Sequence, residues 1–110
     1  MSHEKNQALI SVLTECAVVC NHCYSACLEE PDVSSVVGCI KLDRDCADIC
    51  TITSSLLARG SEHGVHLLKE CAEICDACAS ECEKHAHHHE HCKACAEACR
   101  KCAESCRTMQ

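Results

Sequence analysis

Cysteine spacing is the feature that most constrains what this chain can fold into. Three twelve-residue segments carry four cysteines each, with gaps of four, three and four residues: CAVVCNHCYSAC at 16–27, CAEICDACASEC at 71–82 and CAEACRKCAESC at 95–106. A fourth segment, CIKLDRDCADIC at 39–50, has Asp43 in place of the second cysteine. Gaps of three and four residues follow one face of a helix. Because the pattern is repeated, the sequence predicts four similar helices, each with a cysteine stripe.

These helices are expected to form one all-α domain over residues 1–110, an antiparallel up-down-up-down four-helix bundle with a cysteine-lined core. The 4-3-4 spacing reads the same in both directions, so antiparallel neighbours would place their thiols in matching layers. Turn signals lie between the segments, at Pro31, at Gly60 and in the polar cluster 85–91, and Asp32 and Ser61 are N-cap candidates. The expected helices span roughly 5–29, 33–58, 62–86 and 88–107.

The two ends of this bundle are expected to differ. Toward one end the stripes continue into residues that would form a dry apolar plug: Leu9, Val12, Leu13, Thr53, Leu57, Leu67 and Leu68, with Met109 nearby. The other end carries the Pro31 turn and the segment HAHHHEH, in which His85 and His88 continue the stripes of the third and fourth helices. His88 has the i, i+4 spacing of a shared site with Cys92. Capture of incoming metal and a simple solvated turn are both open interpretations of this segment.

Composition narrows the class of protein. There is no Trp or Phe and only Tyr24 as an aromatic, so much of the core must be sulfur. The net charge of −7 argues against nucleic-acid binding. No secretory signal is recognisable at the N-terminus, and no segment is expected to reach the roughly 20 apolar residues of a membrane span. We therefore expect a cytoplasmic protein with no membrane partner, in which the thiols stay reduced.

Helix geometry also disfavours disulfides within one stripe. Residues three or four apart on a helix have Cβ atoms about 5 to 6 Å apart, whereas a disulfide needs about 3.5 to 4.5 Å. A metal ion can bridge this gap through two bonds of about 2.3 Å each.

Charge favours Cu(I) among the metals that soft thiolates select. Four thiolates around Zn²⁺ leave a charge of −2 in a core where burying charge is costly, whereas one Cu⁺ per thiolate is neutral at any loading. We expect about one copper per cysteine. The expected ligands are Cys16, Cys20, Cys23, Cys27, Cys39, Cys46, Cys50, Cys71, Cys75, Cys78, Cys82, Cys92, Cys95, Cys99, Cys102 and Cys106, with His85, His88, His89 and His91 at the open end. For Asp43 we favour hydrogen bonding within the core over a role as a ligand or as an acceptor next to the metal.

The three complete CxxxCxxCxxxC segments, the CIKLDRDCADIC segment and the histidine-bearing end together resemble the four-helix-bundle copper storage proteins of bacteria, in particular their cytosolic class. The resemblance covers nearly the whole chain. It implies storage of many Cu(I) ions by thiolates, no catalysis and assembly into a homotetramer. An apolar flank at Leu42, Ile49, Ile52 and Leu56 is a candidate interface, and packing of this flank within the monomer is an equally open interpretation. The chain departs from the pattern in having three cysteines on its second helix.

Two other functions are open on the sequence alone. One is a thiol redox or stress protein, and the other is a metallothionein-like zinc buffer. The expected partners of a copper store are copper ions, with a copper chaperone as a candidate delivery protein.

Overall fold

The computed structural model of the chain describes residues 3–109, so residues 1, 2 and 110 of the expected domain lie outside the described part. Four long helices make up most of it: α1 (His3–Leu28), α2 (Val37–Ala58), α4 (Leu68–Glu83) and α5 (Glu90–Thr108). A 3₁₀ turn, η1 (Val33–Val36), precedes α2, and a one-turn helix, α3 (His63–His66), precedes α4. The described part is a rod with principal extents of 45 × 19 × 18 Å and contains no strand.

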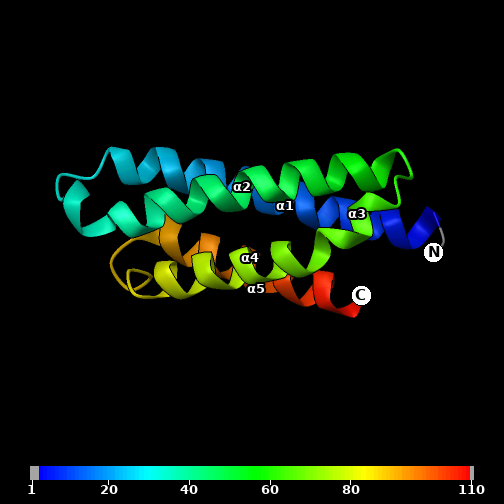
Figure 1. Cartoon of the computed structure of the whole chain (residues 1–110). Helices are drawn as coiled ribbons and strands as arrows, with labels where there is room; N and C mark the ends of the chain where they lie inside the picture. Colours follow the sequence, from blue (N-terminus) through cyan, green and yellow to red (C-terminus); the bar gives the residue numbers. More distant parts are fainter. Residues whose placement is uncertain (1–2, 110) are drawn as a thin grey trace.

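The long helices run antiparallel and pack in a ring in the order α1, α2, α4, α5, with α5 closing back onto α1 (Figure 1). The turn between α2 and α3 lies at the same end of the rod as both termini, and the other two turns lie at the opposite end (Figure 1). The prediction of an all-α, up-down-up-down four-helix bundle is confirmed. Each helix buries one stripe, so the cysteines of all four meet along the axis.

The third helix differs from its prediction because it is broken. It was expected to run over about 62–86, but α3 ends at His66 and α4 begins at Leu68. The Leu67 amide donates to the Gly64 carbonyl at 3.1 Å, a three-residue step that tightens the chain at the break. Gly64 lies directly on Leu57, since a Cβ built at Gly64 would stand 2.9 Å from Leu57 Cδ2. The short α3 therefore folds over the end of α2.

Turn residues account for the other helix ends. Gly60 has a φ of 72°, and the Ser61 amide donates to Leu56 O at 2.9 Å while the Gly60 amide donates to Leu57 O at 3.1 Å. This is the Schellman arrangement that ends helices at glycine. Ser61 acts as the expected cap, since its Oγ accepts from the His63 amide at 3.2 Å. Asp32 occupies the N-cap position, as expected, but of η1, and its side chain makes no capping hydrogen bond.

The apolar plug forms at the end of the rod that holds the termini. Leu9, Leu13, Leu57 and Leu68 are buried, and Val12 and Met109 pack against them as partly buried side chains. The predicted closure of this end is confirmed.

The expectation that no segment approaches a membrane span is not met by length and composition, because α1 passes that test. The segment Asn6–Leu28 of α1 has a mean hydropathy of 1.2, which meets the length and composition of a membrane-spanning helix. Core helices of soluble proteins and signal sequences meet the same criteria. In this structure four cysteines of α1 face the bundle interior and are fully buried or nearly so.

The contact between Gly64 and Leu57 can be tested by substitution. We expect Gly64→Ala to lower the free energy of unfolding of the metal-free protein by about 1 to 3 kcal/mol, because the new methyl would overlap Leu57 in a closed plug. Gly38→Ala is the matched control, since its Cβ would meet only the flexible end of the Glu81 side chain. Chemical denaturation of both variants measures the difference, and equal stabilities would show that α3 does not hold the plug.

Candidate metal centre

The 16 cysteines line the axis of the bundle. All of them are buried and none forms a disulfide. Sulfur atoms from different helices lie close together, from 3.5 Å between Cys46 and Cys75 to 3.9 Å between Cys16 and Cys46. A disulfide bond is about 2.05 Å long, so these are contacts between separate thiols. The predicted sulfur-lined core is confirmed.

The thiols gather into groups whose ligand atoms all lie within 4.8 Å of one another. Successive groups share members, and this makes them a continuous column rather than separate sites. The chain of shared thiols runs from the plug toward the open end through these sets: Cys50 with Cys71, Cys75 and Cys102; Cys16 with Cys46, Cys50 and Cys75; Cys16 with Cys20, Cys46 and Cys99; and Cys20 with Cys78, Cys95 and Cys99. Metal ions bound in neighbouring groups would therefore be bridged by common thiolates.

Asp43 interrupts the column. It is fully buried, and its Oδ1 accepts from the thiols of Cys95 at 3.2 Å and Cys78 at 3.3 Å, with Cys82 further away at 3.8 Å. Burial, followed by the charges of Cys78 and Cys82, raises the pKa of Asp43 to about 9, so the side chain is a neutral carboxylic acid at pH 7. Its Oδ2 has no hydrogen-bond partner among the described residues. The expected hydrogen bonding within the core is confirmed.

His91 is the histidine that the fold brings to the thiols. Its Nδ1 lies 3.6 Å from Cys23 Sγ, 3.8 Å from Cys27 Sγ and 3.6 Å from Cys92 Sγ. These three thiols and the His91 ring form a further group of potential metal ligands, which we call the mouth set. It lies at the end of the column that faces the turns after α1 and α4.

The other three predicted histidines lie elsewhere. The expected link from His88 to Cys92 is not formed, because α5 begins only at Glu90 and His89 before it is extended, so the two residues do not share a helix face. His88 is exposed.

His85 lies beyond the end of α4, and its Nε2 is 3.4 Å from Glu81 Oε2. His89 stacks on His91, with ring centroids 5.2 Å apart.

Glu30 is a residue of this end that the sequence did not reveal. Its Oε2 lies 2.9 Å from His91 Nε2 and 3.3 Å from His89 Nδ1. The hydrogen bond from His91, with smaller effects of charge on His89 and His91, lowers the pKa of the Glu30 carboxyl. Nothing in the local sequence marks Glu30 as different from Glu29, because the contact spans 61 residues of chain.

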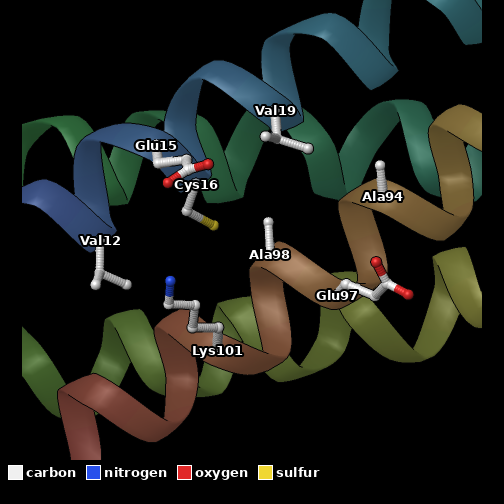
Figure 2. Close-up of a pocket in the computed structure, with 8 residues that line it drawn as sticks. All are labelled: Val12, Glu15, Cys16, Val19, Ala94, Glu97, Ala98 and Lys101. Carbon is white, nitrogen blue, oxygen red and sulfur yellow. The ribbon is translucent and has the colours of Figure 1, made fainter.

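The long sides of the column are closed. A groove of about 270 Å³ runs between α1 and α5, where Ala94 and Ala98 leave room beside Val12 and Val19 (Figure 2). Cys16 lies at its floor but is only 1 % exposed, so the groove gives no direct access to the thiols. Glu15, Glu97 and Lys101 complete its lining.

Two thiols of the mouth set, Cys27 and Cys92, favour their protonated form before metal arrives because their pKa values are raised. Burial, followed by the charge of Cys92, raises the pKa of Cys27 to about 12, and burial raises the pKa of Cys92 as well. Because a metal binds thiolate and not thiol, each ion bound here must displace protons.

Known proteins are similar to this chain in sequence and fold. The family model described as copper storage protein matches residues 2–110. An uncharacterised cysteine-rich protein, YhjQ of Bacillus subtilis (strain 168), is 45 % identical over 104 residues, which cover 94 % of each chain. A cytosolic copper storage protein from Streptomyces lividans, in a structure with five coppers, is 42 % identical with a TM-score of 0.92 over 96 % of this chain and 92 % of that one. The Cu(I)-bound copper storage protein BsCsp3 is 45 % identical, with a TM-score of 0.89 over 96 % and 97 %.

The neutral state of Asp43 predicts how stability depends on pH. In the unfolded chain its pKa falls to about 3.9, so the stability that comes with the raised pKa is complete below that value. It is lost as the pH rises toward about 9. Asn cannot ionise. We therefore expect the stability of Asp43→Asn relative to the original metal-free protein to increase with pH between about 4 and 9, by at most roughly 1.4 kcal/mol per unit.

Thermal unfolding of both proteins across this pH range is the measurement. The difference between them should level off above about pH 9, where Asp43 ionises in the folded protein too. A difference that does not change with pH would show that Asp43 is already charged in the fold.

Proposed function

Because the chain belongs to the copper storage protein family, we propose that it stores and buffers Cu(I) on the thiolates of its bundle core, at about one copper per cysteine. The observation that carries this proposal is the set of 16 buried thiols without disulfides, ten of which form the column of groups that share members. Sulfur is the soft ligand that Cu(I) prefers. A column of shared thiolates suits progressive filling, because each new ion can bridge to those already bound.

Charge balance supports Cu(I) as the cargo. Each Cu⁺ that replaces a thiol proton leaves the core neutral, so the column can fill without accumulating buried charge. The neutral carboxyl of Asp43 fits the same balance, since it adds no charge to the empty core. Filling all groups with Zn²⁺ and four thiolates each would instead leave −2 at every site.

The proposed ligands are the 16 cysteines and His91. Among the four expected histidines, His91 is the one with a ring nitrogen beside the thiols. Copper ions would enter and leave through the mouth set, because the plug closes the other end.

We further propose a cytosolic store without catalytic activity, loaded by a copper chaperone at the histidine-bearing end. Neither nucleic acid nor a membrane is a proposed partner of this acidic chain, which carries a net charge of −7.

Copper capacity is the direct test. Anaerobic titration of the reduced protein with Cu(I), against a competing chelator, should saturate near 16 ions per chain, one for each cysteine. Saturation near one ion per four cysteines would favour a zinc-type buffer. If protein drawn from cells carried mostly intramolecular disulfides under non-reducing mass analysis, the redox function would take its place.

We also propose assembly into a homotetramer through the flank of α2. Ile49 and Ile52 border a shallow groove of about 360 Å³ together with Ile74 of α4, and Ile52 is 52 % exposed. A cluster in which Ile52 is exposed and Ile49 and Ile74 are partly buried favours contact with another protein surface. Asp45 and Asp48 at its edge would form the polar rim of such a contact.

A charge placed in this groove should weaken the assembly. We expect Ile52→Glu to shift the mass measured by sedimentation toward the monomer, because a buried carboxylate beside Asp45 and Asp48 is unfavourable. Val65→Glu, which adds the same charge to an exposed residue of α3, is the control. A monomeric original protein, or an unchanged mass for Ile52→Glu, would exclude this interface.

A further inference from the structure

The mouth set has the geometry of a four-coordinate metal site. A tetrahedral Zn²⁺ with bonds of about 2.3 Å to sulfur and about 2.0 Å to nitrogen would hold two sulfurs about 3.8 Å apart, and a sulfur and a nitrogen about 3.5 Å apart. Cys23 Sγ and Cys27 Sγ are 3.9 Å apart. His91 Nδ1 lies 3.6 Å from Cys23, 3.8 Å from Cys27 and 3.6 Å from Cys92. All four donors lie within 4.8 Å of one another.

Its donors differ from those of the column. The four sharing groups contain sulfur alone, and none of them has a member in common with the mouth set. Three thiolates with one neutral imidazole around Zn²⁺ leave a charge of −1, compared with −2 for four thiolates. His91 is also 13 % exposed, so this smaller charge would lie at the border with solvent. The cost of burying charge, which disfavours zinc along the column, is therefore lowest here.

Glu30 holds the imidazole in the orientation that a metal requires. A carboxylate can only accept a hydrogen bond, so the 2.9 Å contact places a proton on His91 Nε2. In a neutral ring Nδ1 then carries the free lone pair, and it faces the three thiols. A histidine bound to zinc through one nitrogen commonly donates from the other to a carboxylate, and this bond fixes the ring and strengthens it as a ligand.

We propose that the mouth set binds one Zn²⁺ per chain, through Cys23, Cys27, Cys92 and His91 Nδ1, with Glu30 as the positioning residue. Binding forms three zinc–sulfur bonds and one zinc–nitrogen bond, and it releases the three thiol protons to solvent without any change of oxidation state. The zinc site goes beyond copper storage and can be tested without copper.

A zinc ion in this position would occupy the open end of the column until Cu(I) displaces it. It would keep the outermost thiols bound, and so less open to oxidation, while the column behind them is empty. Cu(I), which soft thiolate ligands also select, would displace it as the store fills.

The site can be tested on the metal-free, reduced protein with Co²⁺ as a spectroscopic probe for zinc. The first equivalent of Co²⁺ should produce the intense visible absorption of tetrahedral cobalt bound to thiolate, and one equivalent of Zn²⁺ should remove it. His91→Ala should abolish this first-equivalent spectrum or change its form, because a nitrogen ligand is lost. Glu30→Gln should weaken binding about 10- to 100-fold, the usual effect of losing such a partner.

Two matched controls remove the same kinds of side chain from neighbouring positions outside the proposed site. His88→Ala removes an exposed imidazole of the same turn, and Glu29→Gln removes the neighbouring carboxylate. Both should bind the first Co²⁺ as the original protein does. If His91→Ala leaves the spectrum unchanged, the ion lies in an all-sulfur group and the proposed site is wrong. If Glu30→Gln binds as tightly as Glu29→Gln, the role assigned to Glu30 is wrong.

A second measurement keeps this inference distinct from copper storage. Cu(I) added to zinc-loaded protein should release one Zn²⁺ per chain, detected with a zinc indicator, while the final copper count stays that of the zinc-free protein. Failure of the Co²⁺ and Zn²⁺ experiments with a normal copper count would overturn the zinc site alone. A low copper count with a normal cobalt spectrum would overturn copper storage alone.

Discussion

Contact between thiols of different helices is the constraint on which the rest of this structure depends. Sulfur atoms from all four long helices approach within 4 Å along the axis, for example at 3.6 Å between Cys20 and Cys99. Cysteine is small, so the helices can pack closely around it and still leave its sulfur at the centre. Every cysteine is buried there, and a protonated thiol is neutral, so burying it costs little. A thiolate with a bound Cu⁺ is neutral too and can take the place of the thiol.

The two ends of the rod differ because different side chains continue the same stripes. At the end with the termini, leucines replace cysteine, and α3 folds over Leu57 at Gly64, where an added Cβ would stand 2.9 Å from Leu57 Cδ2. At the other end the stripes stop at turns, and His91 and Glu30 take the positions beside the last thiols. A column that is closed at one end and polar at the other has one natural direction of filling.

Asp43 marks the boundary between the column and the mouth. It occupies a position at which the other three stripes carry cysteine, and it bonds to thiols of both α4 and α5. Its neutral carboxyl preserves the packing of the core without adding a thiol or a charge. Beyond it, the donors change from sulfur alone to sulfur with nitrogen, and with them the balance between Cu⁺ and Zn²⁺ changes.

The sequence by itself determined the helical bundle, its antiparallel order, the sulfur core and the apolar plug. All of these follow from residue spacing of three and four, which is a local property of helices. Only the tertiary structure decided which histidine reaches the thiols. His88 has the right spacing to Cys92, but α5 begins after it, and His91 is placed instead by the packing of α5 against α1. Its partner Glu30 lies 61 residues away, and no local pattern encodes a contact between the turn after α1 and the start of α5.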